Sequence, residues 1–259
     1  MFVEIHLKKF RDLHKEPPII AETDQGEGRS PRQWFKSVAH SFQNVNYELL
    51  AETPVNRAYL KELQADTKTP TLELCISILA WGGMRISNGK QLFSQNNDHW
   101  LCIAEELRRG DRNRKCGYNE FAAHRKQKQL QGLGPAYFTK LLYILPPEKN
   151  KGYIMDQWLG LSINILTGKE IVKLNESITW EWKQKPTNPR LDSWVCDYNT
   201  ADDYENFCTK IESLSSKMGN GWSPELTELA LISEGGRANK KKLWRNYVEN
   251  QRIKRLLKQ

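Results

Sequence analysis

A tight glycine turn between two helix-forming segments constrains the fold of this chain more than any other feature. Gly132 and Gly134 flank Leu133, and Pro135 stands where a following helix would have its first residue. Glycine is favoured where a backbone takes a positive φ or approaches another backbone closely, and a proline at the first helical position sacrifices no hydrogen bond. The sequence therefore predicts a helix, a tight turn with Leu133 pointing inwards, and a second helix.

The segments on both sides of the turn have helical patterns. Residues 119–130 are polar and contain no glycine or proline. After the turn, apolar residues recur at the i, i+3, i+4, i+7 spacing of an amphipathic helix: Phe138, Leu141, Leu142 and Leu145. Free amides and the positive end of the dipole at the start of this second helix would bind a phosphate oxygen.

An aspartate follows the turn at a distance that suggests chemistry. Asp156 lies 22 residues beyond Gly134 and directly before the apolar segment 157–166, which predicts a buried helix. Aspartate is a favoured N-cap because its side chain accepts hydrogen bonds from the first helical amides. Asp156 is therefore either a cap alone or a cap that also presents a carboxylate to a ligand.

The turn, the spacing and the Asp-Gln-Trp sequence together resemble the helix-hairpin-helix DNA glycosylase superfamily, in particular its 8-oxoguanine glycosylase-like branch, over about residues 70–170. The resemblance implies a mostly α-helical fold with two helical lobes, a helix-hairpin-helix motif and a central cleft. It implies that Asp156 is catalytic and that the turn binds DNA through Gly132, Leu133, Gly134 and Ala136. Taken alone, the glycines would favour a plain turn between two packed helices.

The position of lysine in the hairpin bears on the mechanism. In family members that also cut the strand, a lysine lies two residues after the second glycine, where this chain has Ala136. Lys140 follows one helical turn later, so it is either a substitute nucleophile or an ordinary solvent-facing or phosphate-binding lysine. The resemblance thus implies a monofunctional enzyme with little or no lyase activity.

A DNA glycosylase must also turn its target base out of the helix, and two groups of residues are candidates for this task. Residues 71–80 predict a buried helix, and the loop expected over residues 81–90 supplies Met84, Arg85 and Asn88 as a wedge for the DNA stack. The alternative is a Gly-Gly helix end with a packed tryptophan. The candidates for the base pocket are Trp81, Trp158 and Trp222.

Charge and cysteine usage narrow the choice of partners. The formal net charge of +8 over 259 residues favours a polyanion, here double-stranded DNA with a modified base. The five cysteines contain no CxxC pair and the histidines no ligand spacing, so no metal, disulfide or iron–sulfur cluster is expected. The only small ligand that the resemblance allows is a monovalent cation at the hairpin.

The ends of the chain complete the expected organisation. The start lacks the apolar core of a signal peptide and no segment suits a membrane span, so a soluble cytoplasmic protein without an obligate protein partner is expected. Residues 1–259 are expected to form a single glycosylase unit. Within it lie an N-terminal arm (1–30), the hairpin and catalytic loop (about 119–166) and a basic C-terminal helix (240–258). The aromatic-rich residues 169–199 are either a lid or strand insertion near the pocket, or a satellite core under a long loop.

The functional hypothesis is hydrolysis of an N-glycosidic bond in DNA, which leaves an abasic site. The carboxylate of Asp156 would stabilise positive charge on the sugar and position or deprotonate the water. The substrate would be an oxidised purine such as 8-oxoguanine, or a bulky cytosine such as glucosylated hydroxymethylcytosine removed in anti-phage defence. The alternative from another class is a non-catalytic DNA-binding module that uses the hairpin as a phosphate clamp.

Overall fold

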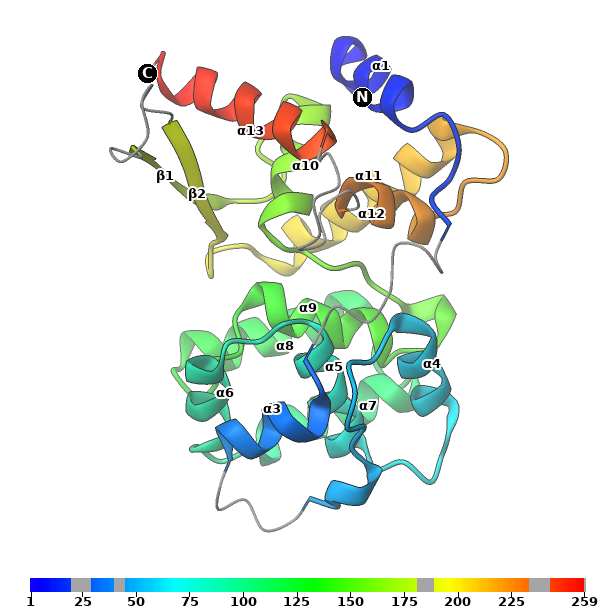
Figure 1. Cartoon of the computed structure of the whole chain (residues 1–259), viewed down its shortest axis with the longest axis vertical. Helices are drawn as coiled ribbons and strands as arrows, with labels where there is room; N and C mark the ends of the chain where they lie inside the picture. The colour runs from blue at the N-terminus through cyan, green and yellow to red at the C-terminus, as the bar shows by residue number, and fades with distance from the viewer. Residues whose placement is uncertain (20–28, 40–44, 181–188, 233–242, 259) are drawn as a thin grey trace. The chain divides into compact units, whose positions relative to one another are not determined.

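The computed structural model describes residues 1–19, 29–39, 45–180, 189–232 and 243–258. Over these residues the chain is mostly helical with one small sheet, which confirms the mostly α-helical part of the prediction (Figure 1). It divides into two compact units. Unit 1 comprises Met1–Thr23, Met155–Asn199 and Asp203–Gln259, and unit 2 comprises Asp24–Ile154 and Thr200–Asp202.

Unit 2 is a cluster of short helices around one buried helix. The central helix is α5 (Thr71–Trp81), whose residues from Glu73 to Ala80 are all buried. It packs against α3, α4, α7 and α9. The surrounding elements are α3 (Pro31–Val38), η1 (Tyr47–Leu49), α4 (Arg57–Ala65), α6 (Ile86–Phe93), α7 (Asp98–Arg109), α8 (Arg114–Lys126), α9 (Pro135–Ile144) and η2 (Glu148–Asn150).

Helices α8 and α9 are the two helices predicted on either side of the glycine turn. Tyr118 and Phe121 of α8 contact Phe138 of α9, with ring centroids 5.0 and 5.3 Å apart. Helix α8 begins earlier than predicted because the side chain of Asn113 caps it by accepting a hydrogen bond from the amide of Cys116 at 2.9 Å. The aromatic contacts hold the two helices together.

The loop predicted over residues 81–90 is wrong in its second half, because α6 begins at Ile86. Its Leu92 and Phe93 are buried, and Gly89 lies so close to Val38 and Trp34 of α3 that a side chain there would clash. Glycine lowers helix propensity, so the sequence alone disfavours a helix here. Packing against α3 outweighs that preference.

Unit 1 is built around α10 (Gln157–Thr167), which is buried along almost its whole length. Against it pack α1 (Glu4–Leu13), α12 (Pro224–Ile232), α13 (Leu243–Leu256) and the antiparallel strands β1 (Leu174–Trp180) and β2 (Pro189–Val195), paired from Leu174↔Val195 to Trp180↔Pro189. Helix α11 (Ala201–Met218) completes the elements. The predicted aromatic-rich segment is thus a hairpin of strands, with Trp182 outside the described residues.

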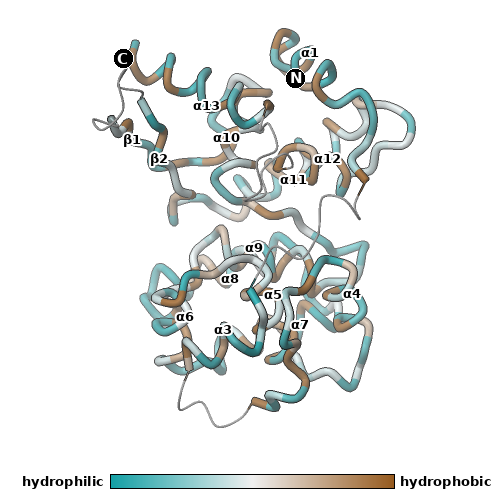
Figure 2. The backbone as a smooth tube through the Cα atoms, viewed as in Figure 1, coloured by the Kyte–Doolittle hydropathy of each residue, from teal (hydrophilic) through white to brown (hydrophobic). Residues whose placement is uncertain are grey.

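Two long-range contacts anchor α13 in unit 1. Trp244 is fully buried and donates a hydrogen bond from Nε1 to Ser162 Oγ of α10 at 3.0 Å. Arg252 forms a two-pronged ion pair with Glu176 of β1, including an Nε to Oε1 bond of 2.6 Å. Hydrophilic and hydrophobic stretches alternate along α13 in Figure 2, as expected of a helix with one face on a core. Of the predicted basic helix, residues 240–242 lie outside the described part.

The predicted N-terminal arm contains a helix that packs on this core. Leu7 and Phe10 of α1 are buried, and the amide of Val3 donates to the carbonyl of Leu166 at 2.7 Å. Phe10 lies 4.8 Å from Trp244 between ring centroids. Within the described residues no helix is long and apolar enough to cross a membrane.

Candidate active site

Asp156 caps α10 with one carboxylate oxygen. Its Oδ1 accepts hydrogen bonds from the backbone amides of Trp158 at 2.8 Å and Leu159 at 2.9 Å. Among the described residues, Oδ2 accepts no hydrogen bond, and the side chain is half-buried. The interpretation of Asp156 as an N-cap is therefore confirmed, and the geometry leaves its second oxygen available to a ligand or a water molecule.

Trp158 and Arg245 lie near this carboxylate within unit 1. The guanidinium carbon of Arg245, on α13, lies 4.9 Å from the ring centroid of Trp158. Burial lowers the pKa of Arg245, and the negative charge of Asp156 acts in the opposite direction. The half-buried guanidinium of Arg245 therefore lies beside the ring of Trp158, two residues after the predicted catalytic Asp156.

Sequence reasoning grouped Arg245 with the other basic residues of the C-terminal helix and did not connect it with Asp156. The two residues are far apart in the chain, and nothing in the sequence indicates their proximity. The structure brings them together, because the buried Trp244 next to Arg245 bonds to Ser162 of α10 and so determines where α13 lies.

Gln157 and Trp158 connect the start of α10 to the sheet. With its carboxamide oriented to suit its neighbours, Gln157 donates a hydrogen bond to the carbonyl of Ser193 on β2 and accepts one from Trp158 Nε1 at 3.2 Å. Trp222, the other predicted pocket residue in this unit, is half-buried between α11 and α12. Its carbonyl accepts a hydrogen bond from Ser215 Oγ at 3.2 Å.

The glycine turn of unit 2 has the conformation that the sequence predicts. Gly132 has a φ of 82°, and a Cβ there would collide with the backbone carbonyl oxygen of Asn88 in α6. Leu133 is fully buried, which confirms that it points inwards. Gly134 is the N-cap of α9 and Pro135 its first residue. The first amides of α9 thus follow directly on a turn that only glycine fits.

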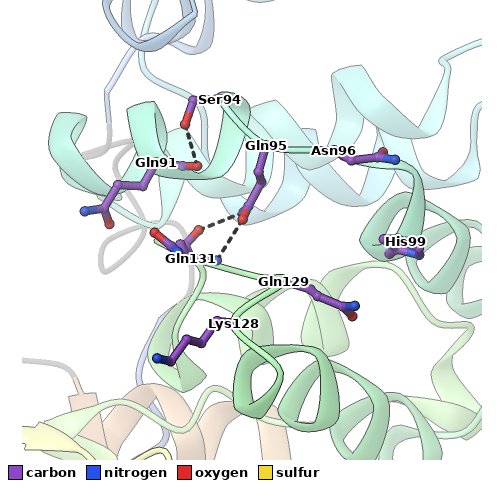
Figure 3. A pocket seen from close by; sticks show the side chains of 8 residues that line it. All are labelled: Gln91, Ser94, Gln95, Asn96, His99, Lys128, Gln129 and Gln131. Carbon is purple, nitrogen blue, oxygen red and sulfur yellow. Dashed lines mark hydrogen bonds between the residues drawn. The ribbon is translucent and has the colours of Figure 1, made fainter.

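Two side chains, one from the connection between α6 and α7 and one from α8, hold this turn in place. The carboxamide of Gln95 bonds both backbone groups of Gln131, accepting from its N–H at 3.1 Å and donating to its carbonyl at 3.1 Å (Figure 3). Arg125 Nη1 donates to the carbonyl of Leu130 at 3.0 Å. The approach to the turn is therefore fixed from both sides before any ligand binds.

The predicted wedge residues differ in their exposure. Met84 is fully buried and its carbonyl accepts a hydrogen bond from Trp34 Nε1 at 2.9 Å. This corrects the prediction for Met84, because a side chain packed in the core of unit 2 cannot enter a DNA stack without leaving it. Arg85 is exposed at the N-cap of α6, and Asn88 is half-buried within α6 beside Gly132.

Lys140 caps the end of a neighbouring helix. Its Nζ donates a hydrogen bond of 2.6 Å to the carbonyl of Gly82, the C-cap of α5, and lies 5.4 Å from the ring centroid of Tyr137. A cation is stabilised at this negative end of the helix dipole. Ala136 is half-buried in the first turn of α9, and Trp81 stacks with Arg57 at 5.5 Å from its ring centroid.

The described residues contain no cluster of side chains that could hold a metal ion. No three histidine, cysteine, aspartate or glutamate side chains converge there, and all five cysteines are free. Burial raises the pKa of Cys75 and of Cys196, so both thiols stay protonated near neutral pH.

Comparison with known proteins identifies the family. A model of the family described as "Putative 8-oxoguanine DNA glycosylase OGG-like protein" matches residues 22–232, a range that includes both the glycine turn and Asp156. The curated proteins and the solved structures gave no match. The family model spans well over half of the sequence, and the chain therefore belongs to the 8-oxoguanine DNA glycosylase OGG-like family.

Proposed function

We propose that this protein is a DNA glycosylase that turns a modified base out of double-stranded DNA and hydrolyses its N-glycosidic bond, leaving an abasic site. The observation that carries the proposal is the carboxylate of Asp156, with Oδ1 held by two backbone amides and no hydrogen bond to Oδ2 among the described residues. A cap that needs only one oxygen leaves the other for chemistry.

The reaction requires stabilisation of positive charge on the sugar. As the bond between base and deoxyribose breaks, the sugar becomes oxocarbenium-like, and a nearby ionised carboxylate lowers the energy of that state. Oδ2 of Asp156 would face the sugar and orient or deprotonate the attacking water. The two amides that hold Oδ1 keep the carboxylate in one position, so little reorganisation is needed during the reaction.

Unit 2 would contribute the grip on the DNA backbone. The turn at Gly132 and Gly134, read as the hairpin of a helix-hairpin-helix motif, leads into the free amides of α9, which suit a phosphate oxygen. Arg85 is the exposed member of the predicted wedge and would enter the space left by the everted base. A monovalent cation bound at the turn would likewise help to hold a DNA phosphate there.

We propose further that the enzyme is monofunctional. Ala136 occupies the place of the usual lysine, and the ammonium group of Lys140 is engaged with the carbonyl of Gly82. An amine that caps a helix is a poor nucleophile, because it must give up that hydrogen bond before it can attack the sugar. Water is then the nucleophile, and the strand stays uncut.

The family favours an oxidised purine such as 8-oxoguanine as the substrate. Duplexes that contain 8-oxoguanine, unmodified DNA and DNA with glucosylated hydroxymethylcytosine would be incubated with the purified protein. Released bases would then be identified by mass spectrometry. We expect free 8-oxoguanine from the first duplex only. Release of the modified cytosine instead would identify that base as the substrate and indicate a role in anti-phage defence.

The decisive variant is Asp156→Asn. Asparagine keeps an oxygen for the cap, so the fold is retained, but it removes the charge. We expect base release to fall by roughly a thousandfold while DNA binding persists. The matched control is Asp12→Asn, an exposed aspartate on α1 of the same unit, which should release base at the normal rate. Equal rates for both variants would reject catalysis by Asp156. Release of no base from any DNA by the wild-type protein, with DNA binding intact, would favour the phosphate-clamp alternative.

A further inference from the structure

A polar pocket of about 390 Å³ lies beside the glycine turn in unit 2 (Figure 3). It is formed by the end of α6, the connection to α7, the first turn of α7 and the connection from α8 to the turn. Five of the eight lining side chains are carboxamides, one is a cation and none is a carboxylate. The lining residues are Gln91, Ser94, Gln95, Asn96, His99, Lys128, Gln129 and Gln131.

Part of this lining is occupied with holding the pocket together. The carboxamide of Gln95 is hydrogen-bonded to the backbone of Gln131, and Gln129 Oε1 lies 2.8 Å from His124 Nδ1. The ring of His124 in turn stacks on His99, with centroids 5.4 Å apart. These contacts fix the walls and leave the remaining polar groups to define what can bind.

The side chains of Ser94 and Asn96 bond to nearby backbone groups, and three of the other side chains keep their hydrogen-bonding capacity. Within the described residues, the side chains of Gln91, Gln131 and Lys128 make no hydrogen bond or ion pair, and all three are exposed at the pocket. Each carboxamide presents a donor and an acceptor side by side, and the lysine presents a positive charge. A ligand that matches this set is planar, carries adjacent donors and acceptors, and bears a negative charge nearby.

A nucleotide has this combination. Glutamine and asparagine read the edges of bases by paired hydrogen bonds, as in the bidentate contact with adenine, and lysine neutralises phosphate. A volume of about 390 Å³ lies in the range of small-molecule sites. The absence of a lining carboxylate removes the repulsion that a phosphate would otherwise meet.

The position of the pocket agrees with this ligand. Gln131 lines it and directly precedes Gly132, and helix α6 touches the turn through Asn88 and lines the pocket through Gln91. Consecutive Cα atoms lie only about 3.8 Å apart. A DNA strand with one phosphate on the turn would therefore bring a neighbouring nucleotide to the pocket.

We propose that this pocket binds the edge of one unpaired nucleobase of the DNA held by the turn, with Lys128 on an adjoining phosphate. The inference rests on the DNA binding of the proposed function and is independent of the chemistry at Asp156. It assigns to the protein a second reading site, which selects the sequence or the mispaired context of the target.

Fluorescence anisotropy on four duplexes, each with a single unpaired A, C, G or T, tests the pocket. We expect the wild-type protein to prefer one of the four by about tenfold. The double variant Gln91→Leu/Gln131→Leu should bind all four equally, at the weaker affinity. Both positions are exposed, so the fold should be retained, and a thermal melt checks it. Gln33→Leu, at an exposed glutamine of α3, is the matched control.

Lys128→Gln separates the phosphate contact from the base contact. It should weaken binding to all four duplexes to the same extent and reduce the slope of log affinity against log salt by about 0.9. Lys36→Gln, on the exposed face of α3, should leave both quantities unchanged.

The outcomes distinguish this inference from the proposed function. Equal wild-type affinity for the four duplexes, or an unaltered preference in the double variant, overturns the pocket assignment even if base release continues. A preference that the double variant abolishes supports the pocket even if no base is ever released, in which case the proposed hydrolysis fails alone.

Discussion

The two regions proposed to act on DNA are built in opposite ways. The carboxylate of Asp156 is held by amides two and three residues further along the chain. Besides a local bond from Arg125, the glycine turn is held by the side chain of Gln95, more than thirty residues away, and it lies against the backbone of Asn88 in α6. A local arrangement survives as long as its own helix forms, whereas the turn depends on the packing of the whole of unit 2.

This difference predicts where substitutions do harm. At the start of α10 the outcome depends on the chemistry of one side chain, because the partners are backbone groups that every residue supplies. At the turn it depends on the space that neighbouring helices leave. The following substitutions probe the comparison, from the largest expected effect to the smallest.

Gly132→Ala should have the largest effect on stability. Alanine at a φ of 82° is strained and its Cβ would collide with the carbonyl of Asn88, so we expect a loss of about 3 kcal/mol, measured by chemical denaturation. Gly83→Ala is the matched control. It has a φ of 69° with no atom near the added Cβ, and should cost only about 1 kcal/mol. Similar losses for both would show that conformation, and not neighbouring packing, restricts the turn.

Asp156→Ala compared with Asp156→Asn tests the local arrangement. Alanine cannot accept the two amide hydrogen bonds, so the variant should be less stable by about 1 to 2 kcal/mol, while asparagine should cost much less. Both variants should lose base release. If alanine proved as stable as asparagine, the cap would not contribute to the position of the carboxylate.

Lys140→Met probes a contact between distant residues with a modest expected effect. Loss of the bond to the carbonyl of Gly82 leaves the C-terminal end of α5 uncapped. This should lower the free energy of unfolding by about 0.5 to 1 kcal/mol. Base release should stay within a few-fold of normal, and borohydride should trap no covalent complex with DNA in either protein. Trapping that disappears in the variant would identify Lys140 as a nucleophile and contradict the monofunctional assignment.

The smallest expected effect is a dependence of the stability of unit 1 on pH. His6 Nδ1 lies 2.7 Å from the hydroxyl of Tyr247 and connects α1 to α13, and burial lowers the pKa of His6. The folded state therefore binds a proton less readily than the unfolded state, whose histidine pKa is about 6.5. Stability from this group is present above that pH and is lost as the pH falls towards the lower folded pKa.

Thermal melts at pH 7.5 and pH 5.5 measure this effect as a difference between proteins. His6→Gln cannot be protonated, so its melting temperature should fall less over this interval than that of the wild type. Identical shifts in the two proteins would mean that His6 does not contribute to the pH dependence.

Much of the helical framework was predictable, because periodicity and capping are local properties. The helices predicted from apolar spacing and from Asp156 appear as α5, α9 and α10 within a residue or two of their expected ends. The errors share a physical cause. Helix α6 contains a glycine that disfavours it and forms because that glycine fits against α3, and Met84 is buried by the same packing.

The sequence by itself determined the turn, the helices on both sides of it and the capping carboxylate, since each depends on residues only a few positions apart. Only the tertiary structure decided that Lys140 caps α5, that Arg245 lies over Trp158 and that five carboxamides meet beside the turn. Their partners come from distant segments. The packing of the buried apolar faces decides which polar side chains become neighbours. A local sequence pattern does not contain that information.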